Sequence, residues 1–487
     1  KYTYSLLVYE SVMPAKKSSA PAEILSLIPA DEPGCALNWN EKSQRWYVFR
    51  WLGTTYDPVR KRGIDRRESV GYIEDGQFHY SKRYLLQKQL RTLQPESPQP
   101  AKKVLEKAIE SIQDKRQPGK VIYPIDIVLT VMVLASLSGY TGAVSIATYW
   151  KRFHNDLAAL IDHFPTQDIS HDTVNRLLRL INPKQMQQLI DKLTPSLMSQ
   201  MKQCLLHGDG QCVRATHRQD QTSGRYFFNV YSSENSLLIY HCLIDEKTNE
   251  IPSAYEAFSS LDVKGCTVTF DAMNTQPRLA GLLHQRGAQY CMALKDNKSA
   301  LLSKVLEVLN HSSLSEHYEC TDAGHGRIEQ RIVKVVPARL LDKSVLSTWE
   351  GLQDGCLVQV RCITESKRNY KTEEKKTEQT RYFLSSVAYE QEDVAAKMEQ
   401  IIRRHWSVEN NLHWTLDEAF AQDRIQCKDA NYLQNRVTLN KAALNQLKTW
   451  QSKLKEDKNL TYSIKTLMQL CCTPKDALET IALLHEK

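Results

Sequence analysis

Three acidic residues of this chain stand where a carboxylate is unexpected, and each has the chemistry to bind a divalent metal ion. Asp271 directly follows the β-branched and aromatic run Thr267–Phe270 in the stretch GCTVTFDAMNTQ (265–276). An acid at this point is a favoured helix N-cap. It is also suited to a metal site, because open α/β sheets keep their chemistry at the carboxyl ends of their strands. Taken alone, the residue favours the capping interpretation.

A second such acid, Asp209, lies in the stretch LLHGDGQ between two glycines. The pattern places it within or at the end of the first strand of a three-strand unit. The alternative is a Gly-Asp-Gly turn, in which Asp is a common residue. For Asp209 considered by itself, the turn is the better interpretation.

The third acid, Glu409, falls in the segment IIRRHWSVENNLHWTLDEAF (401–420), which is predicted to be one helix. Spacings of four and three residues put it on the predicted core-facing stripe, whose members are Ile402, Trp406, Glu409, His413, Leu416 and Phe420. An unpaired ionised carboxylate there costs several kcal/mol. Glu409 therefore needs a cation, either a metal ion or an arginine such as Arg403 or Arg404.

The elements expected around these acids give them a common site. From residue 204 the pattern changes to strands and helices in the order β-β-β-α-β-α-β. One acid is then on the first strand, one ends the fourth strand, and one is on a later helix. This is the arrangement of the metal-binding core of the ribonuclease H-like fold. Such acids hold two ions about 3.5–4 Å apart, and oxygen ligands suit Mg²⁺ or Mn²⁺ rather than zinc.

A chain of 487 residues is long enough for several domains. The predicted fold class is α/β: a ribonuclease H-like catalytic core with a mostly β insertion, preceded by a helical domain and a small β-rich N-terminal module. The expected parts are the N-terminal module with a charged turn at 57–69 (1–93), a Pro-rich linker (94–103), a helical DNA-binding or dimerisation region (104–203), the catalytic domain (204–450, with the β insertion at about 312–386) and a helical tail (451–487).

Composition narrows the class of protein further. The formal net charge of +8 suits a polyanionic partner, and it is equally compatible with a solvated Lys-rich surface. The twelve cysteines show no C-x-x-C spacing, and several lie in apolar runs, so a reducing, cytoplasmic compartment is expected. The most apolar run, 125–147, is interrupted by polar residues and is predicted to be a buried helix rather than a membrane span. No signal peptide is expected.

Several ordered motifs resemble the DDE transposases of bacterial insertion sequences, and in particular the H-repeat-associated type. They are DEKTNEIP (245–252), GCTVTFDAMNTQ, GAQYCMALKDNK (287–298), GHGRIEQR (324–331), TRYFLSS (380–386) and HWSVENNLHWTLDEAFAQD (405–423). The stretch ISHDTVNRLLRLINP resembles the helical segment that precedes the catalytic domain in that family. The resemblance covers roughly residues 104–450. It implies that Asp209, Asp271 and Glu409 match the catalytic triad.

The chain also departs from the family pattern. Gln211 stands where the family usually has Lys, and Asn274 stands where it usually has Gly. The broader group often carries a Tyr-Arg-Glu-Lys signature around the third acid, whose other positions are here occupied by Ile402, His405 and Leu416. The N-terminal module is longer than in the related type. These departures put any hairpin chemistry of the broader group in doubt.

The resemblance implies a bacterial, nucleoid-associated DNA transposase that cleaves and joins strands with two Mg²⁺ or Mn²⁺ ions. Its expected partners are the terminal inverted repeats and the target DNA, and a second copy of the chain in the DNA complex. Rival interpretations are a domesticated DNA-binding protein without cleavage activity and a two-metal nuclease of the same fold. The residues expected to grip phosphates, each otherwise an ordinary surface charge, are Lys295, Lys298, Arg327, Arg331, Arg404, Arg60, Arg62, Arg66 and Arg67.

Overall fold

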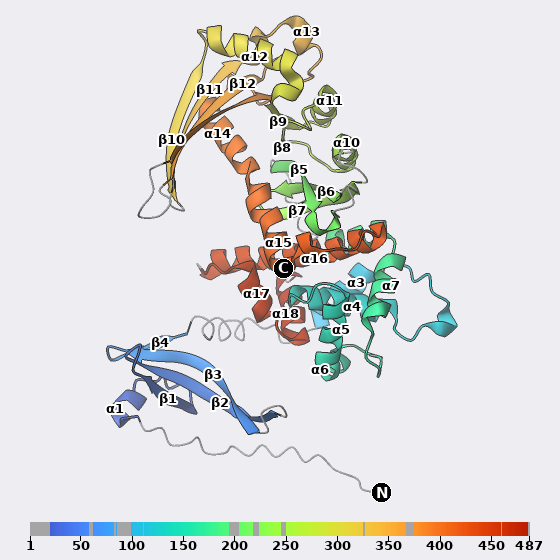
Figure 1. Cartoon of the computed structure of the whole chain (residues 1–487), viewed down its shortest axis with the longest axis vertical. Helices are drawn as coiled ribbons and strands as arrows, with labels where there is room; N and C mark the ends of the chain where they lie inside the picture. Colours follow the sequence, from blue (N-terminus) through green and yellow to red (C-terminus); the bar gives the residue numbers. More distant parts are fainter. Residues whose placement is uncertain are drawn as a thin grey trace. The chain divides into compact units, whose positions relative to one another are not determined.

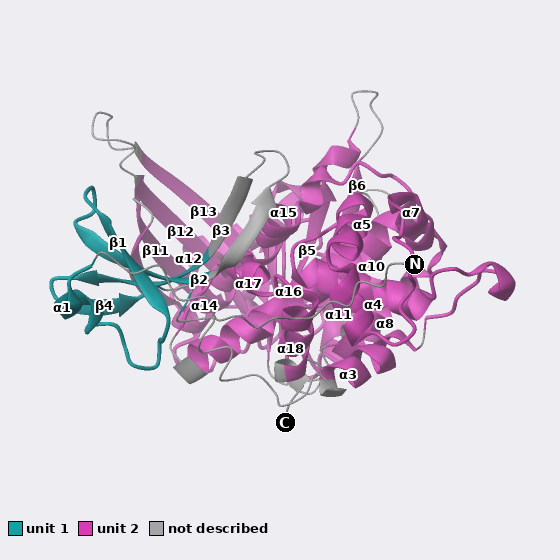
Figure 2. Cartoon of the chain, turned by 90° about the horizontal axis from the view of Figure 1, so that it is seen from below, with its two compact units in different colours: residues 1–97 teal, residues 98–487 magenta. Residues whose placement is uncertain are grey.

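The chain divides into two compact units, Lys1–Ser97 and Pro98–Lys487 (Figure 2). A computed structural model gives the structure (Figure 1). The residues that it describes are 20–57, 62–81, 84, 99–110, 112–193, 204–217, 224–244, 250–324, 327–366, 375–458 and 460–485.

The N-terminal unit is built on a four-stranded antiparallel sheet with the strand order β1-β2-β3-β4. Its elements are α1 (Ala22–Leu25), β1 (Cys35–Asn40), β2 (Arg45–Asp57), β3 (Arg62–Glu74) and β4 (Gln77–Tyr80). Leu37, Val48, Val70, Ile73 and Tyr84 form its core. The predicted charged turn at 57–69 is wrong from Arg62 onward. Backbone pairing with β2 makes this segment a strand, because pairing overrides the weak strand preference of charged residues.

Part of the predicted linker is helical. Helix α3 (Gln99–Ile109) begins inside the stretch 94–103, so the prediction is wrong for residues 99–103. Pro100 is compatible with a helix here, because proline lacks only an N–H that the first turn leaves unbonded anyway. Residues 94–98 lie outside the described part of the chain.

Helices from both ends of the second unit pack together. The N-terminal set continues with α4 (Ile125–Leu137), α5 (Ala143–Arg152), α6 (His154–Leu160), α7 (His171–Leu180) and α8 (Pro183–Leu193), and the C-terminal set is α16 (Ala430–Lys458), α17 (Ile464–Leu470) and α18 (Pro474–His485). Helix α16 contacts α4, α7 and α8, and α18 contacts α3. The expected boundary at residue 450 therefore falls inside a continuous helix.

Two local sequence predictions in this helical region are confirmed. The Ser170 side chain caps α7 by accepting a hydrogen bond from the Thr173 backbone N–H at 3.2 Å. Helix α4 is buried along most of its length, as its apolar composition predicted. Within the described residues, no helix is both long enough and apolar enough to cross a membrane.

A nine-stranded mixed sheet forms the centre of the second unit, with the order β10-β11-β12-β13-β9-β8-β5-β6-β7. Its strands are β5 (Leu205–Val213), β6 (Arg225–Ser232), β7 (Leu237–Ile244), β8 (Thr267–Phe270), β9 (Gln289–Leu294), β10 (Glu316–Gly324), β11 (Arg327–Pro337), β12 (Cys356–Ser366) and β13 (Lys375–Ser385). With α10 (Glu250–Ser260) and α11 (Pro277–Gln285), the predicted order β-β-β-α-β-α-β is confirmed. The predicted β insertion is not a separate sheet, because β13 pairs with β9 and extends the central one.

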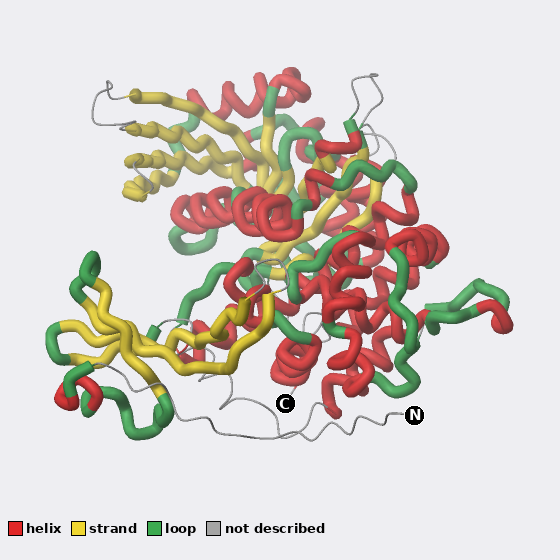
Figure 3. The backbone as a smooth tube through the Cα atoms, turned by 60° about the horizontal axis from the view of Figure 1, so that its bottom comes forward, coloured by secondary structure: helices red, strands yellow, loops and turns green. Residues whose placement is uncertain are grey.

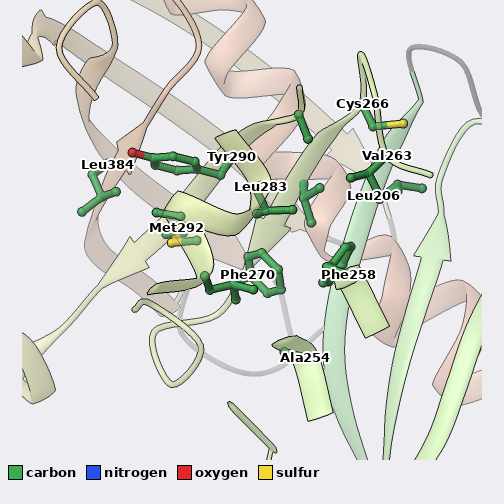
Figure 4. Packing of buried hydrophobic residues seen from close by; sticks show 14 of the residues in the cluster. Leu206, Ala254, Phe258, Val263, Cys266, Phe270, Leu283, Tyr290, Met292 and Leu384 are labelled. Carbon is green, nitrogen blue, oxygen red and sulfur yellow. The ribbon is translucent and has the colours of Figure 1, made fainter. Parts of the chain in front are cut away.

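Helices cover both faces of this sheet (Figure 3). On one face α10, α11 and α12 (Ser299–His311) bury a cluster around Phe258, Phe270 and Tyr290 (Figure 4). On the other face α14 (Val394–His405) packs Met398 and neighbouring apolar residues against the strands. The short helix α13 (Lys343–Leu346) lies between β11 and β12. Helix α15 (Trp414–Phe420) follows α14 and is preceded by the π-helical turn η6 (Val408–His413). The sheet is thus held rigidly on both sides.

Candidate metal-binding site

The strand register brings Asp209 and Asp271 to neighbouring positions. Strands β5 and β8 are parallel, and the last residues that pair between them are Gly208 and Phe270. The next residue on each strand is one of the two acids. Neighbouring strands lie about 4.8 Å apart, so the two acids are adjacent where β8 ends.

Asp271 uses one carboxylate oxygen as a cap, and its other oxygen remains available to bind a metal ion. Its Oδ1 accepts hydrogen bonds from the backbone N–H of Asn274 at 3.2 Å and from Nδ2 of the same residue at 3.1 Å. The acid therefore caps the turn after β8 and not a helix, since α11 begins only at Pro277. The other carboxylate oxygen accepts no hydrogen bond from the described residues.

Asp209 lies in the middle of β5, so the Gly-Asp-Gly turn considered for it is wrong. The flanking glycines are there because neighbouring side chains press on the strand. A Cβ at Gly208 would come within 2.6 Å of the Phe270 ring, and one at Gly210 within 2.7 Å of the Glu250 carboxylate. The sequence therefore selects glycine for close packing on both sides of the acid.

Asp209 borders a buried polar chain that runs away from the strand. Its cross-strand partner is Asn229 on β6. Asn229 accepts a hydrogen bond from Lys441 Nζ at 2.6 Å and lies 3.0 Å from Nε2 of His413. Burial lowers the pKa of His413 to about 3, so this imidazole is neutral. With the amide donating to Nε2, its proton is on Nδ1, which lies 3.8 Å from the Asp209 carboxylate.

The electrostatics around Asp209 call for a cation. Burial raises the pKa of Asp209 well above its usual value, and the carboxylates of Asp271, Glu250 and Glu409 raise it further. A backbone hydrogen bond from Gly210 opposes this only in part. Several acids near one another without enough positive charge are stabilised by a divalent ion.

Glu409 is exposed, so its predicted place on a core-facing stripe is wrong. The predicted continuous helix ends at His405, and Glu409 lies in the π-helical turn η6. A π turn bonds residue i to i+5, which shifts the side-chain faces relative to an α-helix. Trp406, another expected member of the stripe, is 38% exposed.

The arginines considered as partners of Glu409 bind other acids. Arg403 pairs with Glu329 at 3.0 Å, and Arg404 pairs with Glu234 at 3.0 Å. Among the described residues neither is ion-paired to Glu409. The salt-bridge alternative for this acid therefore has no support in the structure.

The three acids line one cleft of about 420 Å³, here called the acidic cleft. Its other walls include Lys295, His405 and Trp406. Within the described ranges, no three His, Cys, Asp or Glu side chains are already close enough together to hold an ion. The three acids would nevertheless offer only carboxylate oxygens as ligands. Such ligands are the type that Mg²⁺ and Mn²⁺ prefer.

Four of the predicted phosphate-gripping residues in the second unit remain candidates. Lys295 is exposed and lines the acidic cleft. Lys298 donates to the Gln276 side chain at 3.1 Å. Arg327 and Arg404 have half-exposed side chains that pair with Glu329 and Glu234. The Arg404–Glu234 pair lies at the surface, where ion pairs are weak and exchange readily for phosphate.

Arg331 is not a surface residue, and its prediction as a DNA-gripping side chain is wrong. Its side chain is 8% exposed, and all three guanidinium nitrogens are occupied. They bind Glu399 at 2.7 Å, Glu329 at 3.1 Å and Asp322. The residue joins β11 to α14 instead of facing solvent.

The basic residues of the N-terminal unit are only partly described. Arg60 lies outside the described residues, and for Arg62 and Arg66 only the backbone in β3 is described. Arg67 is exposed, with its guanidinium 4.7 Å from the centre of the Phe49 ring.

Sequence reasoning missed Glu250, Asn229 and Lys441. Glu250 is only 6% exposed, and its carboxylate accepts a hydrogen bond from Asn274 Nδ2 at 2.5 Å. An acid in the first turn of a helix is common for electrostatic reasons alone, so nothing in the local pattern set it apart. Lys441 is fully buried in α16 among other buried polar side chains, so nothing in the local pattern set it apart.

Fold and cleft together define an α/β protein with a carboxylate-lined cleft where its central parallel strands end. The family described as "Transposase DDE domain" matches residues 201–446, and the family described as "DDE_Tnp_1-associated" matches residues 107–193. The chain belongs to the DDE transposase family.

Relatives of known name agree with this assignment. The "H repeat-associated putative transposase YhhI" of Escherichia coli K12 is 30% identical over 339 residues, which cover 68% of this chain and 86% of that protein. The "H repeat-associated putative transposase YbfD" of the same strain is 28% identical over 248 residues, covering 50% and 97%. The resemblance to the H-repeat-associated type is therefore confirmed.

Among solved structures, the piggyBac transposase in its synaptic complex with hairpin DNA is similar to this chain. The similarity covers 79% of this chain and 81% of the piggyBac chain. The sequence identity is 14% and the TM-score is 0.40, which is too low to establish a common fold.

Proposed function

We propose that this chain is a DNA transposase that binds the terminal inverted repeats of its own element and cleaves and joins DNA strands at the acidic cleft. The observation that carries the proposal is the position of Asp209, Asp271 and Glu409 around one cleft in a member of the DDE transposase family. The strand order β7-β6-β5-β8-β9 fits the ribonuclease H-like core expected for that chemistry.

In this proposal the three carboxylates hold two Mg²⁺ or Mn²⁺ ions. When bound, such ions lower the pKa of a water or a DNA 3′-hydroxyl and stabilise the leaving oxygen in an in-line phosphoryl transfer. Asp209 and Asp271 contribute ligands from fixed strand positions, and Glu409 contributes one from the facing turn. Lys295 at the rim of the cleft neutralises phosphate charge on the bound strand.

DNA is the proposed partner, both as the terminal inverted repeats and as the target. Lys298, Arg327 and Arg404 are proposed phosphate contacts beside the cleft, and Arg60, Arg62, Arg66 and Arg67 are proposed contacts of the N-terminal unit. A second copy of the chain is proposed to hold the other DNA end in a homodimer. The proposed location is the bacterial nucleoid.

The test is cleavage of a duplex carrying the inverted repeats that flank the element, with Mg²⁺ present. Asp271→Asn should lower the cleavage rate by about a thousandfold or more, because several kcal/mol of transition-state stabilisation are lost with a ligand. Binding of the DNA end should be retained or strengthened, since a negative charge is removed. Glu418→Gln is the control, because Glu418 is ion-paired to Lys465 and does not line the cleft.

The outcomes separate the rival functions. Wild-type protein that binds the ends and leaves them uncut would identify a domesticated DNA-binding protein. Cleavage without end specificity or strand joining would identify a nuclease. Cleavage by Asp271→Asn at the wild-type rate would exclude the proposed chemistry. Loss of activity in Glu418→Gln but not in Glu409→Gln would reassign the third acid.

A further inference from the structure

Asn274 links two carboxylates behind the acidic cleft. Its side chain is fully buried in the turn after β8. Its Nδ2 donates to Glu250 Oε1 at 2.5 Å and to Asp271 Oδ1 at 3.1 Å. A primary amide has two N–H protons, so one serves each carboxylate. This residue is also one of the positions where the chain departs from the family pattern.

Glu250 lies behind the sheet and not in the cleft. Its Oε2 would be 2.7 Å from a Cβ placed on Gly210. Side chains alternate between the faces of a strand, so Gly210 faces away from the side to which Asp209 points. Neither Glu250 nor Asn274 is among the residues that line the cleft. Glu250 therefore reaches the site through Asn274.

We propose that Glu250 and Asn274 are positioning residues that fix the carboxylate of Asp271 in one orientation for the metal ion. This inference rests on the proposed function. Two donors from Asn274 hold Oδ1, which stops rotation of the carboxylate and directs the other oxygen to the ion. Glu250 in turn holds the amide. Hydrogen bonds of this kind behind a metal ligand are worth about 10–100-fold in metal affinity.

The chemistry of this arrangement requires an amide at position 274. Glycine would keep the backbone N–H to Asp271 and remove the side-chain donor to both acids. Aspartate has the same shape but no donor, and it would add a negative charge between two carboxylates. An alanine or glycine at this position should therefore loosen Asp271 without unfolding the sheet.

Metal binding by the full-length protein tests this without DNA or catalysis. Mn²⁺ is titrated into each variant in the absence of DNA, and the free ion is followed by electron paramagnetic resonance. We expect Asn274→Ala and Asn274→Gly to weaken Mn²⁺ binding about 10–100-fold. Glu250→Ala should do the same. Glu250→Gln should stay near the wild type, because the Gln side-chain oxygen still accepts the hydrogen bond from Asn274.

A matched control is Asn435→Ala. Asn435 is also fully buried, and its Nδ2 donates to the carbonyls of Leu178 and Ile181, both at 2.8 Å, in the helical region. This variant should lower the melting temperature and leave Mn²⁺ affinity unchanged. Circular dichroism with EDTA present verifies that every variant is folded before titration.

The outcomes are distinct. Wild-type Mn²⁺ affinity in folded Asn274→Ala and Asn274→Gly would overturn the inference. A loss in Glu250→Gln as large as that in Asp271→Asn would also overturn it, since Glu250 would then be a direct ligand. If Asp271→Asn itself binds Mn²⁺ normally, the proposed metal site fails. As a last readout, saturating Mn²⁺ should restore DNA cleavage in Asn274→Ala and not in Asp271→Asn.

Discussion

The strand side of the acidic cleft is fixed by buried hydrogen bonds, whereas its helix side is an exposed turn. Asp209 lies within β5, and Asp271 is held by two donors from Asn274. Glu409, opposite them, is exposed in the π-helical turn η6. Two acids of the proposed site are therefore held by contacts on the strand side, whereas the third is exposed.

Among the described residues, no three acids are grouped closely enough to hold an ion. A π turn inside a helix is a common feature of functional sites. We infer that the strand side determines where an ion binds.

An ion-pair cluster ten residues before Glu409 helps to anchor the helix side of the cleft. Glu399 on α14 is bound to Arg331 on β11 at 2.7 Å, and both side chains are nearly buried. Arg331 also binds Glu329 and Asp322. The position of the turn that carries Glu409 therefore depends on an ion-pair cluster outside the cleft.

The largest effect on stability is expected from breaking this cluster. Arg331→Met should lower the free energy of unfolding by about 3–5 kcal/mol, because it leaves the buried carboxylate of Glu399 without the arginine that binds it, whereas Glu329 keeps its other arginine partners. Urea unfolding measures this. Arg361→Met on the neighbouring strand is the control. Its pair with Glu378 is half-exposed, so the loss of stability should be much smaller than in Arg331→Met.

A double variant sharpens the interpretation. Arg331→Met combined with Glu399→Leu removes an unpaired buried charge and should recover part of the stability lost in the single variant. If Arg331→Met alone costs no more stability than Arg361→Met, the ion-pair cluster does not anchor α14.

A smaller effect of opposite sign is expected on the strand side. Without metal, Asp209→Asn should stabilise the protein at pH 7 by about 0.5–2 kcal/mol, because it removes a charge that burial and neighbouring acids disfavour. Glu409→Gln should change stability by less than about 0.5 kcal/mol, because Glu409 is exposed. Both are measured by urea unfolding with EDTA present.

The pH dependence gives this comparison a second test. The pKa of Asp209 is raised in the folded state, so the folded protein retains a proton that the unfolded chain releases above a pKa of about 3.9. The metal-free wild type should lose stability as pH rises from that value through the raised pKa, and Asp209→Asn should lose less. Mg²⁺ should stabilise the wild type only. If the stability of the metal-free Asp209→Asn and Glu409→Gln variants depends on pH in the same way, the carboxylate of Asp209 is no more disfavoured in the folded state than that of Glu409.

Local signals in the sequence were sufficient to predict much of this fold. Alternating apolar residues and turn residues predicted the order β-β-β-α-β-α-β, because strand periodicity is a property of neighbouring residues. The Ser170 cap was predictable for the same reason. That order was enough to bring Asp209 and Asp271 together, since β5 and β8 are parallel neighbours.

Features that depend on distant contacts or on unusual helix geometry were not predictable. The stripe through Glu409 was drawn for an α-helix, and the π turn changes which residues share a face. Arg331 reads as a surface residue in its strand, yet its partners come from β10, β11 and α14. Glu250 is separated from Asn274 by 24 residues, so their hydrogen bond leaves no local pattern.

The smallest effect is expected just beyond the helix side of the cleft, at Asp417 on α15. Gln211 Nε2 donates to Asp417 Oδ1 at 3.2 Å, and Gln211 Oε1 accepts from Gln422 at 2.9 Å. Burial, with a contribution from the Asp423 charge, raises the pKa of Asp417 to about 6. A neutral amide at position 211 cannot offset that cost as the lysine usual in the family would.

Asp417→Asn should therefore gain stability relative to the wild type as pH rises from about 4 to about 6, and the gain should stay constant above that range. Below pH 4 the carboxyl is protonated in both folded and unfolded wild type, so the two proteins should differ little there. The gain at pH 7 should be on the order of 1 kcal/mol, because the side chain is partly exposed and screened by solvent. Gln211→Lys should reproduce part of this gain in stability by placing a cation beside Asp417.

Urea unfolding at pH 4, 5, 6 and 7 with EDTA present measures all three proteins. A difference between the wild type and Asp417→Asn that is constant over this range would show that Asp417 titrates as an ordinary surface acid. The ionised carboxylate of Asp417 would then not destabilise the folded protein, in contrast to that of Asp209 on the strand side.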